Sequence, residues 1–415
     1  MTAPFSSSLE RWMLRKILNA TGPAPIRLTF GDSVGVSPPS TTPVGTIVIH
    51  NAKTLIKLIL DPEIGLGDGY ADGGIEVQGD LVNTAEAVYR TWPAIGGGTG
   101  HKLWSRCMEH LRANTPRRSR DNVHHHYDLR TDFYQRWLDP QLVYTCAYFP
   151  TPSATLEEAQ LAKMDHVCRK LQLLPGETVV EAGCGWGALA LHMARYYGVR
   201  VKAFNLSHEQ IVFARQRARQ EGLSQHVEFI EDDYRNISGR FDAFVSIGML
   251  EHVGLSQYAE LGGVIHRSIG SSGRGLLHFI GRNYPAPLST WIRKRIFPGA
   301  YPPTLREAMA ILEPWDFSVC DVENLRLHYA KTLEHWLARF ERSSEQLTDM
   351  FDDRFVRTWR IYLAGSLVAF RVGTMQLFQV MFAGSECKRI PWTRAYLYQA
   401  DQRQAQEQTW TNVMS

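Results

Sequence analysis

The sequence predicts an α/β protein built on a doubly wound, mostly parallel sheet and preceded by a small α+β unit. Three observations lead to this fold class. Strand-like and helix-like segments alternate from residue 177 onward, as a parallel sheet requires. An apolar strand at 178–181 runs directly into a cluster of glycines and then into a helix. The first 110 residues lack this alternation and are expected to contain short strands, short helices and turns.

The glycine cluster at the end of that strand is the most informative motif. Residues 179–190 read Val-Val-Glu-Ala-Gly-Cys-Gly-Trp-Gly-Ala-Leu-Ala, with glycines at 183, 185 and 187. Glycine allows a sharp turn and lets a ligand lie against bare peptide groups. The spacing differs from the G-x-G-x-x-G of dinucleotide sites, and no lysine follows to hold a phosphate. The motif therefore predicts a site for the nucleoside and methionyl parts of S-adenosylmethionine.

The order of the remaining segments agrees with such a site. Residues 284–375 interrupt the alternation with mostly helical sequence rich in Trp, Arg and Phe. Gln376–Phe382 is then expected to be a late antiparallel strand paired with Phe317–Glu323. Five parallel strands followed by such a hairpin make the Rossmann-like, seven-stranded sheet of class I methyltransferases, here with a helical insertion. The five parallel strands are expected at Thr178–Glu181, Arg200–Phe204, Val227–Glu231, Phe241–Ser246 and Gly275–Ile280.

Residues 1–110 are expected to form a small α+β domain without an acid–base or nucleophile cluster, which favours a binding role. We expect a turn in the glycine-rich stretch 65–74 and a return toward helix over 75–81. The other expected elements are a helix over Leu9–Leu18, strands over Ile26–Phe30 and Gly45–His50, and a helix over Ala52–Leu60 after an Asn51 cap.

A linker is expected at residues 111–122, before a catalytic domain over 123–415. It overlaps a zone, 93–121, that contains consecutive glycines and a local group of arginines. Two interpretations stay open for this zone. It is either a solvated linker or a contact with anionic phospholipid headgroups, where each basic residue contributes about 1 kcal/mol.

Ligands of a doubly wound sheet bind outside the carboxyl ends of its strands. Polar residues at the second and third strand ends are therefore candidates to bind the cofactor, with helix capping as the alternative role. The amide Asn205 stands where many nucleoside-binding proteins carry an acid for the ribose hydroxyls. The candidates at the first three strand ends are Glu181, Gly183, Gly185, Gly187, Asn205, Gln210, Asp232 and Asp233.

Two ionisable residues follow the next two strands, Glu251 after the fourth and His278 within the end of the fifth. Because these strand ends are neighbours, the two side chains are expected to converge on one small ligand. Three consecutive histidines at 124–126 suggest a metal at first sight. Adjacent side chains do not share one face, however, and no acid or cysteine follows at helical spacing, so no metal site is expected.

Composition limits the remaining choices. The chain has 415 residues, 44% of them hydrophobic and 21% charged, with a net charge of +3, which excludes a strong overall field for polyanions. Six cysteines lie scattered without a C-x-x-C pair, which indicates reduced thiols in a cytoplasm. No apolar run approaches the roughly 20 residues of a membrane span. Met1–Lys16 lacks the apolar core and small-residue end of a signal peptide.

Four motifs, in this order and spacing, resemble the cyclopropane-fatty-acyl-phospholipid synthases and the related mycolic acid methyltransferases. They are Tyr144-Thr-Cys-Ala-Tyr-Phe149, Gly183-Cys-Gly-Trp-Gly187, Asp233-Tyr-Arg235 and Gly248-Met-Leu-Glu-His-Val-Gly254. The resemblance covers about residues 120–385. The N-terminal region resembles the bacterial lipid-synthase branch, which carries an extra lipid-binding domain.

This resemblance implies transfer of the sulfonium methyl of S-adenosylmethionine to a cis double bond in a phospholipid acyl chain. A carbocation forms, and a bound bicarbonate ion removes a proton as the ring closes. Tyr144 and Thr145 are implied to face the methionyl end of the cofactor. The implied catalytic residues, which would form the bicarbonate pocket, are Cys146, Glu251, His278 and Tyr329.

The resemblance also implies partners and a location. They are an unsaturated phospholipid, a second copy of the chain, and the inner face of the membrane, on which a cytoplasmic enzyme would act peripherally. The near-neutral charge and the lack of an Asn-Pro-Pro-Tyr-type motif argue against nucleic acid. The alternatives are a small-molecule methyltransferase and a lipid-binding protein without catalysis, and the latter would need no such catalytic set.

Two positions depart from the family pattern. Ser366 stands where the family usually has cysteine, and Asn205 where relatives often carry threonine. Ser366 lies in a segment expected to face the acyl chain, so we expect it to tune the substrate or the fate of the cation. A hydride shift before proton loss would give a methylene or methyl-branched chain instead of a ring, and the sequence leaves this outcome open.

Overall fold

The computed structural model describes residues 7–32, 35–39, 42–91 and 130–398. They fall into two compact units, which we describe separately. The sheet unit comprises Ala113–Pro285, Gly299–His328 and Gln376–Ser415, and the helical unit comprises Met1–Arg112, Ala286–Pro298 and Tyr329–Met375. By contacts, the insertion helices thus group with the N-terminal region. The expected division into 1–110, 111–122 and 123–415 remains a prediction about function, and the linker and the histidines at 124–126 lie outside the described residues.

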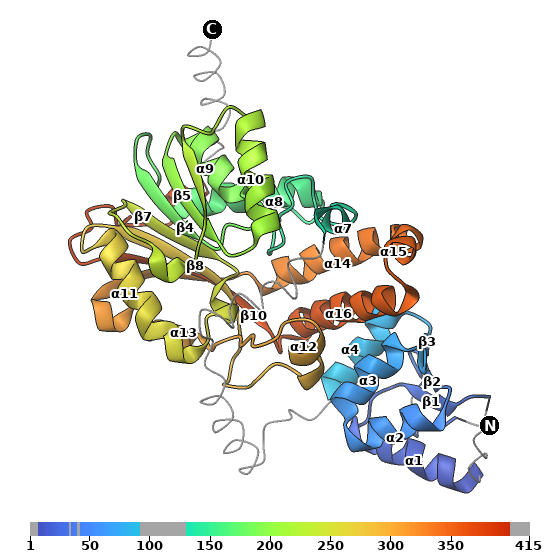
Figure 1. The fold of residues 1–415 in the computed structure, drawn as a ribbon. Helices are drawn as coiled ribbons and strands as arrows, with labels where there is room; N and C mark the ends of the chain where they lie inside the picture. Colours follow the sequence, from blue (N-terminus) through green and yellow to red (C-terminus); the bar gives the residue numbers. More distant parts are fainter. Residues whose placement is uncertain (1–6, 33–34, 40–41, 92–129, 399–415) are drawn as a thin grey trace. The chain divides into compact units, whose positions relative to one another are not determined.

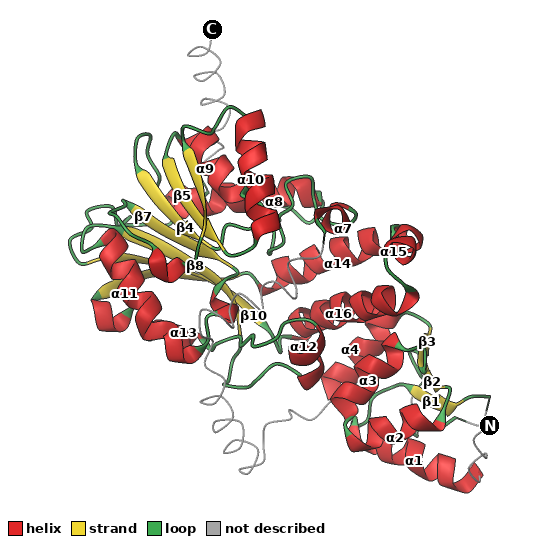
Figure 2. Cartoon of the chain, in the orientation of Figure 1, coloured by secondary structure: helices red, strands yellow, loops and turns green. Residues whose placement is uncertain are grey.

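The sheet unit contains a seven-stranded sheet in the order β6-β5-β4-β7-β8-β10-β9. Figure 1 labels β5, β4, β7, β8 and β10 of this sheet, and Figure 2 draws its strands in yellow. The five strands β4 to β8 are parallel, and β10 runs antiparallel to both β8 and β9. The predicted class I methyltransferase fold is therefore confirmed. The strands are β4 Thr178–Ala182, β5 Arg200–Asn205, β6 Val227–Glu231, β7 Ala243–Ile247, β8 Arg274–Gly281, β9 Phe317–Asn324 and β10 Gln376–Gly384.

Helices cover both faces of this sheet (Figure 1). Successive strand residues point to opposite faces, and apolar side chains on both faces are buried by these helices. Val179 packs with residues of α8, α9 and α10, whereas Val180 packs with residues of α11 and α13. The helices of this unit are α7 Thr131–Gln135, α8 Leu156–Lys170, α9 Ala188–Tyr197, α10 His208–Gln220, α11 Tyr258–Ile269 and α13 Leu305–Met309. Short 3₁₀ helices are η1 Tyr234–Asn236, η2 Leu250–His252, η3 Leu255–Gln257, η4 Glu313–Trp315 and η5 Ala395–Leu397.

The helical unit contains a small sheet in the order β1-β2-β3, with β1 parallel and β3 antiparallel to β2. Its strands are β1 Arg27–Phe30, β2 Thr46–Ile49 and β3 Ile75–Gln78. Its helices are α1 Ser7–Ala20, α2 Ala52–Leu60, α3 Pro62–Ala71, α4 Leu81–Thr91, α12 Thr290–Arg295, α14 Arg326–Arg342 from Tyr329 onward, α15 Ser344–Met350 and α16 Asp353–Val372. The helix expected at 52–60 is confirmed, and the Asn51 side chain accepts the Thr54 N–H at 2.9 Å as its cap.

The turn expected at 65–74 is wrong, because most of that stretch forms helix α3 after an Asp61 cap. Its glycines serve close packing instead of a turn. A Cβ on Gly67 would collide with the Trp291 indole, and a Cβ on Gly65 would lie 2.7 Å from the Leu58 nitrogen. Residues 75–78 form strand β3, and a helix begins only at Leu81. Among the helices of the described ranges, none has both the length and the apolarity to cross a membrane.

The substitution Gly67→Ala is expected to destabilise the helical unit by about 1–3 kcal/mol, because the added methyl group meets the buried Trp291 ring. Gly365→Ala is the matched control, since a Cβ on that α16 glycine meets only the Tyr89 hydroxyl at 3.9 Å and alanine favours helix. Urea unfolding of both variants measures the difference. Equal midpoints would contradict the packing role of Gly67.

Candidate active site

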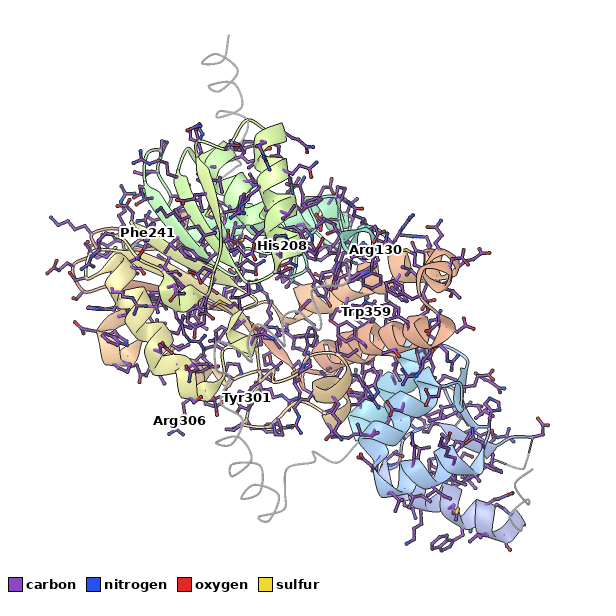
Figure 3. The ribbon with its side chains drawn as sticks, in the orientation of Figure 1. Arg130, His208, Phe241, Tyr301, Arg306 and Trp359 are labelled. Carbon is purple, nitrogen blue, oxygen red and sulfur yellow. The ribbon has the colours of Figure 1, made fainter. Side chains whose placement is uncertain are left out.

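A pocket opens outside the carboxyl ends of β4, β5, β6 and β7, where a doubly wound sheet binds its ligands. It brings together every predicted cofactor-binding residue except Gly187. The predicted residues that line it are Tyr144, Thr145, Glu181, Gly183, Gly185, Asn205, Gln210, Asp232 and Asp233. Two residues labelled in Figure 3 help to locate this pocket. His208 follows the carboxyl end of β5, and Phe241 precedes the amino end of β7.

The glycines of the motif contribute in two ways. Gly183, Gly185 and Gly187 all have positive φ, of 84°, 54° and 84°, which L-residues rarely adopt. Apart from its two chain neighbours, no described residue has an atom within 4 Å of a Cβ built on Gly185, so its backbone is open to a ligand in the pocket. Gly187 instead precedes α9, where a Cβ would lie 2.6 Å from the Phe229 ring. Its described contacts therefore give it a part in the turn.

At the second strand end, the amides Asn205 and Gln210 bind each other. Asn205 Nδ2 donates to Gln210 Oε1 at 2.7 Å and to the Gly185 carbonyl at 3.3 Å. The capping role that was the alternative for such residues belongs to Ser207, whose hydroxyl accepts the Gln210 N–H at 3.4 Å. The glycine loop and the second strand end are thus tied together at the wall of the pocket.

At the third strand end, the two aspartates differ in their partners. Asp233 caps η1 and forms an ion pair with Arg235 at 2.8 Å. Asp232 accepts the Asp233 N–H at 2.7 Å and the Asn236 side-chain amide at 2.8 Å, both through Oδ1. Within the described ranges, Asp232 therefore keeps Oδ2 available to a ligand, whereas much of the hydrogen-bonding capacity of Asp233 is already used.

A buried lysine completes the floor of the pocket, and sequence reasoning missed it. Lys163 and Glu181 both line the pocket and are each only 2% exposed. The Lys163 ammonium donates to Thr145 Oγ1 at 3.0 Å, while Glu181 Oε2 is buried with no hydrogen-bond partner in the described part of the chain. Burial lowers the pKa of Lys163 to about 8 and raises the pKa of Glu181 to about 8. A lysine and a glutamate in one pocket, whose charged forms lack a full set of partners among the described residues, fit the carboxylate and ammonium groups of a methionyl ligand.

Glu251 follows β7 and His278 lies on the neighbouring strand β8, while their convergence on one small ligand stays a prediction. Glu251 is on η2, 6% exposed, and its Oε1 accepts the Ile280 N–H of β8 at 2.5 Å. His278 is on β8, 2% exposed, and its Nδ1 accepts from the Gln379 side-chain amide of β10 at 3.0 Å. The remaining side-chain atoms, Glu251 Oε2 and His278 Nε2, are buried without a hydrogen-bond partner among the described residues.

Burial shifts the pKa values of these two groups toward their neutral forms. It raises the pKa of Glu251 to about 7, against the opposing effect of the Ile280 N–H. Burial, with a further contribution from Lys163, holds the pKa of His278 well below its usual range. His278 is therefore a neutral imidazole that accepts at Nδ1 and carries its proton on Nε2.

The other two predicted catalytic residues lie in different units. Cys146 is buried in the sheet unit, and its Sγ approaches the Leu325 carbonyl at 3.9 Å. Tyr329 belongs to the helical unit, where its ring packs against Phe370 at 4.5 Å and Trp336 at 5.9 Å. The joint role of the four residues stays a prediction.

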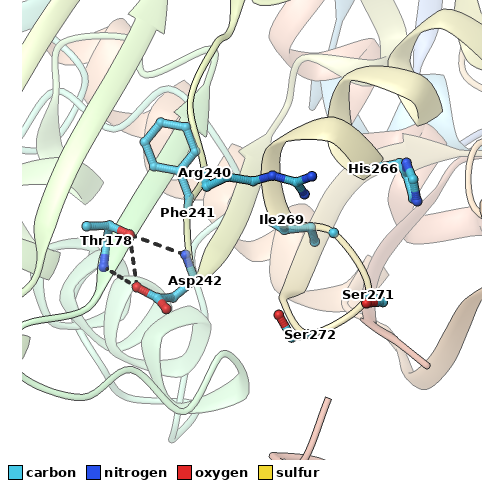
Figure 4. A pocket seen from close by; sticks show the side chains of 9 residues that line it. Thr178, Arg240, Phe241, Asp242, His266, Ile269, Ser271 and Ser272 are labelled. Atoms are coloured by element: carbon cyan, nitrogen blue, oxygen red, sulfur yellow. Dashed lines mark hydrogen bonds between the residues drawn. The ribbon is translucent and has the colours of Figure 1, made fainter. Parts of the chain in front are cut away.

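A second hollow lies at the opposite edge of the sheet (Figure 4). Its lining includes Thr178 at the start of β4 and Asp242 just before β7, which hydrogen-bond each other at 2.9 Å. No predicted site residue lines it. The pocket at the carboxyl ends is therefore the candidate active site.

Comparison with known proteins identifies the family. Residues 114–380 match the model of a family described as mycolic acid cyclopropane synthetase. The chain belongs to this family. It is 33% identical over 387 residues to a probable fatty acid methyltransferase of Pseudomonas putida, which covers 91% of this chain and 96% of the relative. It is 34% identical over 349 residues to the cyclopropane-fatty-acyl-phospholipid synthase of Escherichia coli K12, which covers 81% of this chain and 87% of the relative.

The solved structures agree with this assignment. Mycolic acid cyclopropane synthase CmaA1 in complex with SAH and CTAB matches with a TM-score of 0.61 and 32% identity, over 63% of this chain and 97% of that one. The present chain is accordingly an S-adenosylmethionine-dependent C-methyltransferase. Its reaction is cyclopropane fatty-acid synthesis or a related methylation of a lipid.

We expect Lys163→Met to weaken S-adenosylmethionine binding about tenfold or more, the size of one lost charge-assisted hydrogen bond. Methylthioadenosine, which lacks the amino-acid end, should bind the variant as it binds the wild type. Titration calorimetry with both ligands measures this. Lys202→Met removes an exposed lysine of β5 as the control. Equal loss of both ligands in Lys163→Met would contradict a contact with the methionyl group.

Proposed function

We propose that this enzyme transfers a methylene group from S-adenosylmethionine to the cis double bond of an unsaturated phospholipid acyl chain and so forms a cyclopropane ring. The proposal rests on two buried polar atoms beside the cofactor pocket, Glu251 Oε2 and His278 Nε2, for which no hydrogen-bond partner is found within the described part of the chain. A reaction that removes a proton from the transferred methyl group needs a proton acceptor, and these two atoms could hold one.

These two atoms fit a bound bicarbonate ion. His278 Nε2 carries a proton and can donate to an oxyanion, while Glu251, with its pKa raised to about 7, can donate or accept. Orphaned polar atoms in a protein interior are costly unless a ligand satisfies them. When bound, the cofactor supplies the methyl group and bicarbonate supplies the proton acceptor. Cys146 and Tyr329 are proposed to complete the anion pocket.

The described residues also include aromatic side chains that could stabilise the proposed carbocation. An alkene is a poor nucleophile, so much of the rate must come from its orientation against the methyl group. The carbocation that follows needs apolar and aromatic surroundings. In the helical unit, the rings of Tyr329, Trp336 and Phe370 make one such cluster, whereas Trp291 is engaged with Asp68 through a 3.1 Å hydrogen bond.

A phospholipid substrate implies that the enzyme binds a membrane surface. The helical unit carries exposed side chains suited to such binding. Trp12 on α1 is 52% exposed and Leu60 on α2 is 78% exposed, and α1 packs against α2. The Lys16 ammonium lies 4.7 Å from the Trp12 ring centroid, and Lys53 is exposed on α2. Exposed apolar side chains beside cations suit an anionic phospholipid surface. We propose peripheral binding to the inner face of the membrane by a cytoplasmic homodimer.

The product is tested by expressing the enzyme in a bacterium without cyclopropane lipids and analysing its fatty acids by mass spectrometry. A gain of one CH₂ with no remaining double bond is expected. The same mass with a retained double bond would instead favour a methylene or methyl-branched product, the alternative suggested by the relative named a fatty acid methyltransferase. Ser366, half-buried on α16, is then the first position to exchange for cysteine. An unchanged mass would contradict both products.

Glu251→Gln separates the catalytic role from cofactor binding in the same experiment. The amide keeps the shape of the side chain but cannot become a carboxylate, so product should fall at least about a hundredfold, as for loss of a group that assists proton transfer. The affinity for S-adenosylmethionine should stay within about threefold. Lost cofactor affinity would show that Glu251 belongs to the cofactor site instead.

The double variant Trp12→Ala, Leu60→Ser is expected to bind vesicles of anionic phospholipid about tenfold more weakly, since two apolar side chains no longer enter the interface. Vesicle sedimentation measures this, and S-adenosylmethionine affinity should not change. Val212→Ser removes an exposed apolar side chain of α10 in the sheet unit as the control. Unchanged sedimentation of the double variant would rule out this surface.

A further inference from the structure

Two histidines hold the segment 144–149, which carries three predicted site residues. Tyr144 and Thr145 line the cofactor pocket at one end of the segment. At its other end, the Tyr148 ring lies stacked between two imidazoles. Its centroid is 4.3 Å from that of His166, with an interplanar angle of 16°, and 4.8 Å from that of His328, with an angle of 12°. Ring stacking therefore holds the segment in place at the end remote from the pocket.

Helix α8 supplies the contacts on one side of this segment. The Gln160 side-chain amide donates to the Thr145 carbonyl at 2.9 Å, and the Tyr148 N–H donates to the Ala159 carbonyl at 3.0 Å. His166 comes from the same helix, about one turn after Lys163, so these polar side chains share a face. None of these contacts depends on the junction of β9 with the first turn of α14, the turn in which His328 lies.

His328 supplies the contact from that junction. Its Nδ1 accepts the backbone N–H of Phe149 at 3.0 Å, and an imidazole nitrogen can accept only while it carries no proton. Cys146, in the middle of the segment, approaches the same junction through the Leu325 carbonyl at 3.9 Å. His328 also directly precedes Tyr329 in the chain. A proton on Nδ1 would replace this hydrogen bond with a clash between two donors.

We propose that His328 is a positioning residue whose neutral imidazole seats the segment Tyr144–Phe149 at the cofactor pocket by accepting the Phe149 N–H, and that protonation of His328 releases it. The residue touches neither cofactor nor substrate in this scheme. It acts through the segment, and its protonation state couples the pocket to pH. The inference depends on the cofactor site and not on which lipid product the enzyme makes.

The groups that face His328 decide at which pH this happens. They are Tyr148 from the segment itself, His166 from α8 and Glu323 from β9, and Glu323 is bound by His166 and Lys170 at 2.7 Å each. Burial lowers the pKa of His328, and His166 lowers it further, while Glu323 raises it. The neutral form is thus favoured in the seated state.

The direction of the pH effect follows from this shift. A released, solvated His328 would titrate near the ordinary value of about 6.5. Because the seated state binds its proton only at lower pH, the hold is at full strength above that value and weakens as the pH falls below it. Cofactor affinity should therefore decline on the acid side.

Two variants of nearly equal polarity test the proposal. In His328→Asn, the side-chain carbonyl oxygen lies close to the place of Nδ1 and can accept the Phe149 N–H without titrating. In His328→Gln, the amide reaches the place of Nε2 and leaves that N–H without its acceptor. Affinity for S-adenosylmethionine is measured by titration calorimetry between pH 5 and 8, with thermal melting as a check on folding.

At pH 8 we expect His328→Asn to bind within about threefold of the wild type and His328→Gln to bind about tenfold more weakly, as for one lost hydrogen bond with its acceptor removed. Below pH 6.5 the wild type should lose affinity relative to His328→Asn. Parallel pH profiles for the wild type and His328→Asn would overturn the proposal, and so would equal affinities of the two variants at pH 8. Failure of the lipid assay in the wild type would bear on the proposed function alone, because this readout needs no lipid.

Discussion

Buried charge without a full set of protein partners is the constraint on which this site depends. An isolated ion in a protein interior costs several kcal/mol of free energy. Such groups therefore either become neutral or are stabilised when a ligand of opposite charge binds. Lys163 and Glu181 beneath the pocket, and Glu251 and His278 at the next strand ends, are all buried to at least nine-tenths. Their pKa values are shifted toward the neutral forms. Ligands of complementary charge would replace the favourable interactions with water that these groups lose on burial.

The sheet supplies the positions of these groups, and α8 supplies their support. Parallel strands end at one edge, so the glycine turn after β4 and the polar residues after β5, β6 and β7 meet there without any long connection. The segment 144–149 has no strand to hold it. It lies along a polar face of α8 instead, with Gln160, Lys163 and His166 each engaging it. A helix that buries polar side chains thus takes the place of a ladder of strand hydrogen bonds.

The sequence was sufficient where local pattern and tertiary role agree. The parallel strands of the large sheet were expected within two residues of their ends, because each is an apolar run bounded by turn residues. It was insufficient for α3, where the glycines of 65–69 suggest a turn locally but are required by the Trp291 ring and the α2 backbone. Lys163 was missed because a lysine in a helix is normally solvated. Its spacing from Gln160 and His166 was the available signal, and only the fold shows that this face is buried.

The hydrogen bonds around His278 and Glu251 bear on the nature of the base. His278 Nδ1 is occupied by the Gln379 amide, and Nε2 already carries the proton, so the imidazole cannot take up another without breaking a buried hydrogen bond. Glu251 has one oxygen tied to the Ile280 N–H, and the other faces the interior. A carboxylate fixed against the acyl chain would also be a nucleophile toward a carbocation and risks covalent capture. In the proposed reaction, a small anion held by the neutral imidazole and a partly protonated Glu251 would accept the proton and leave. The two buried atoms without a partner among the described residues therefore suit a diffusible base better than a side chain.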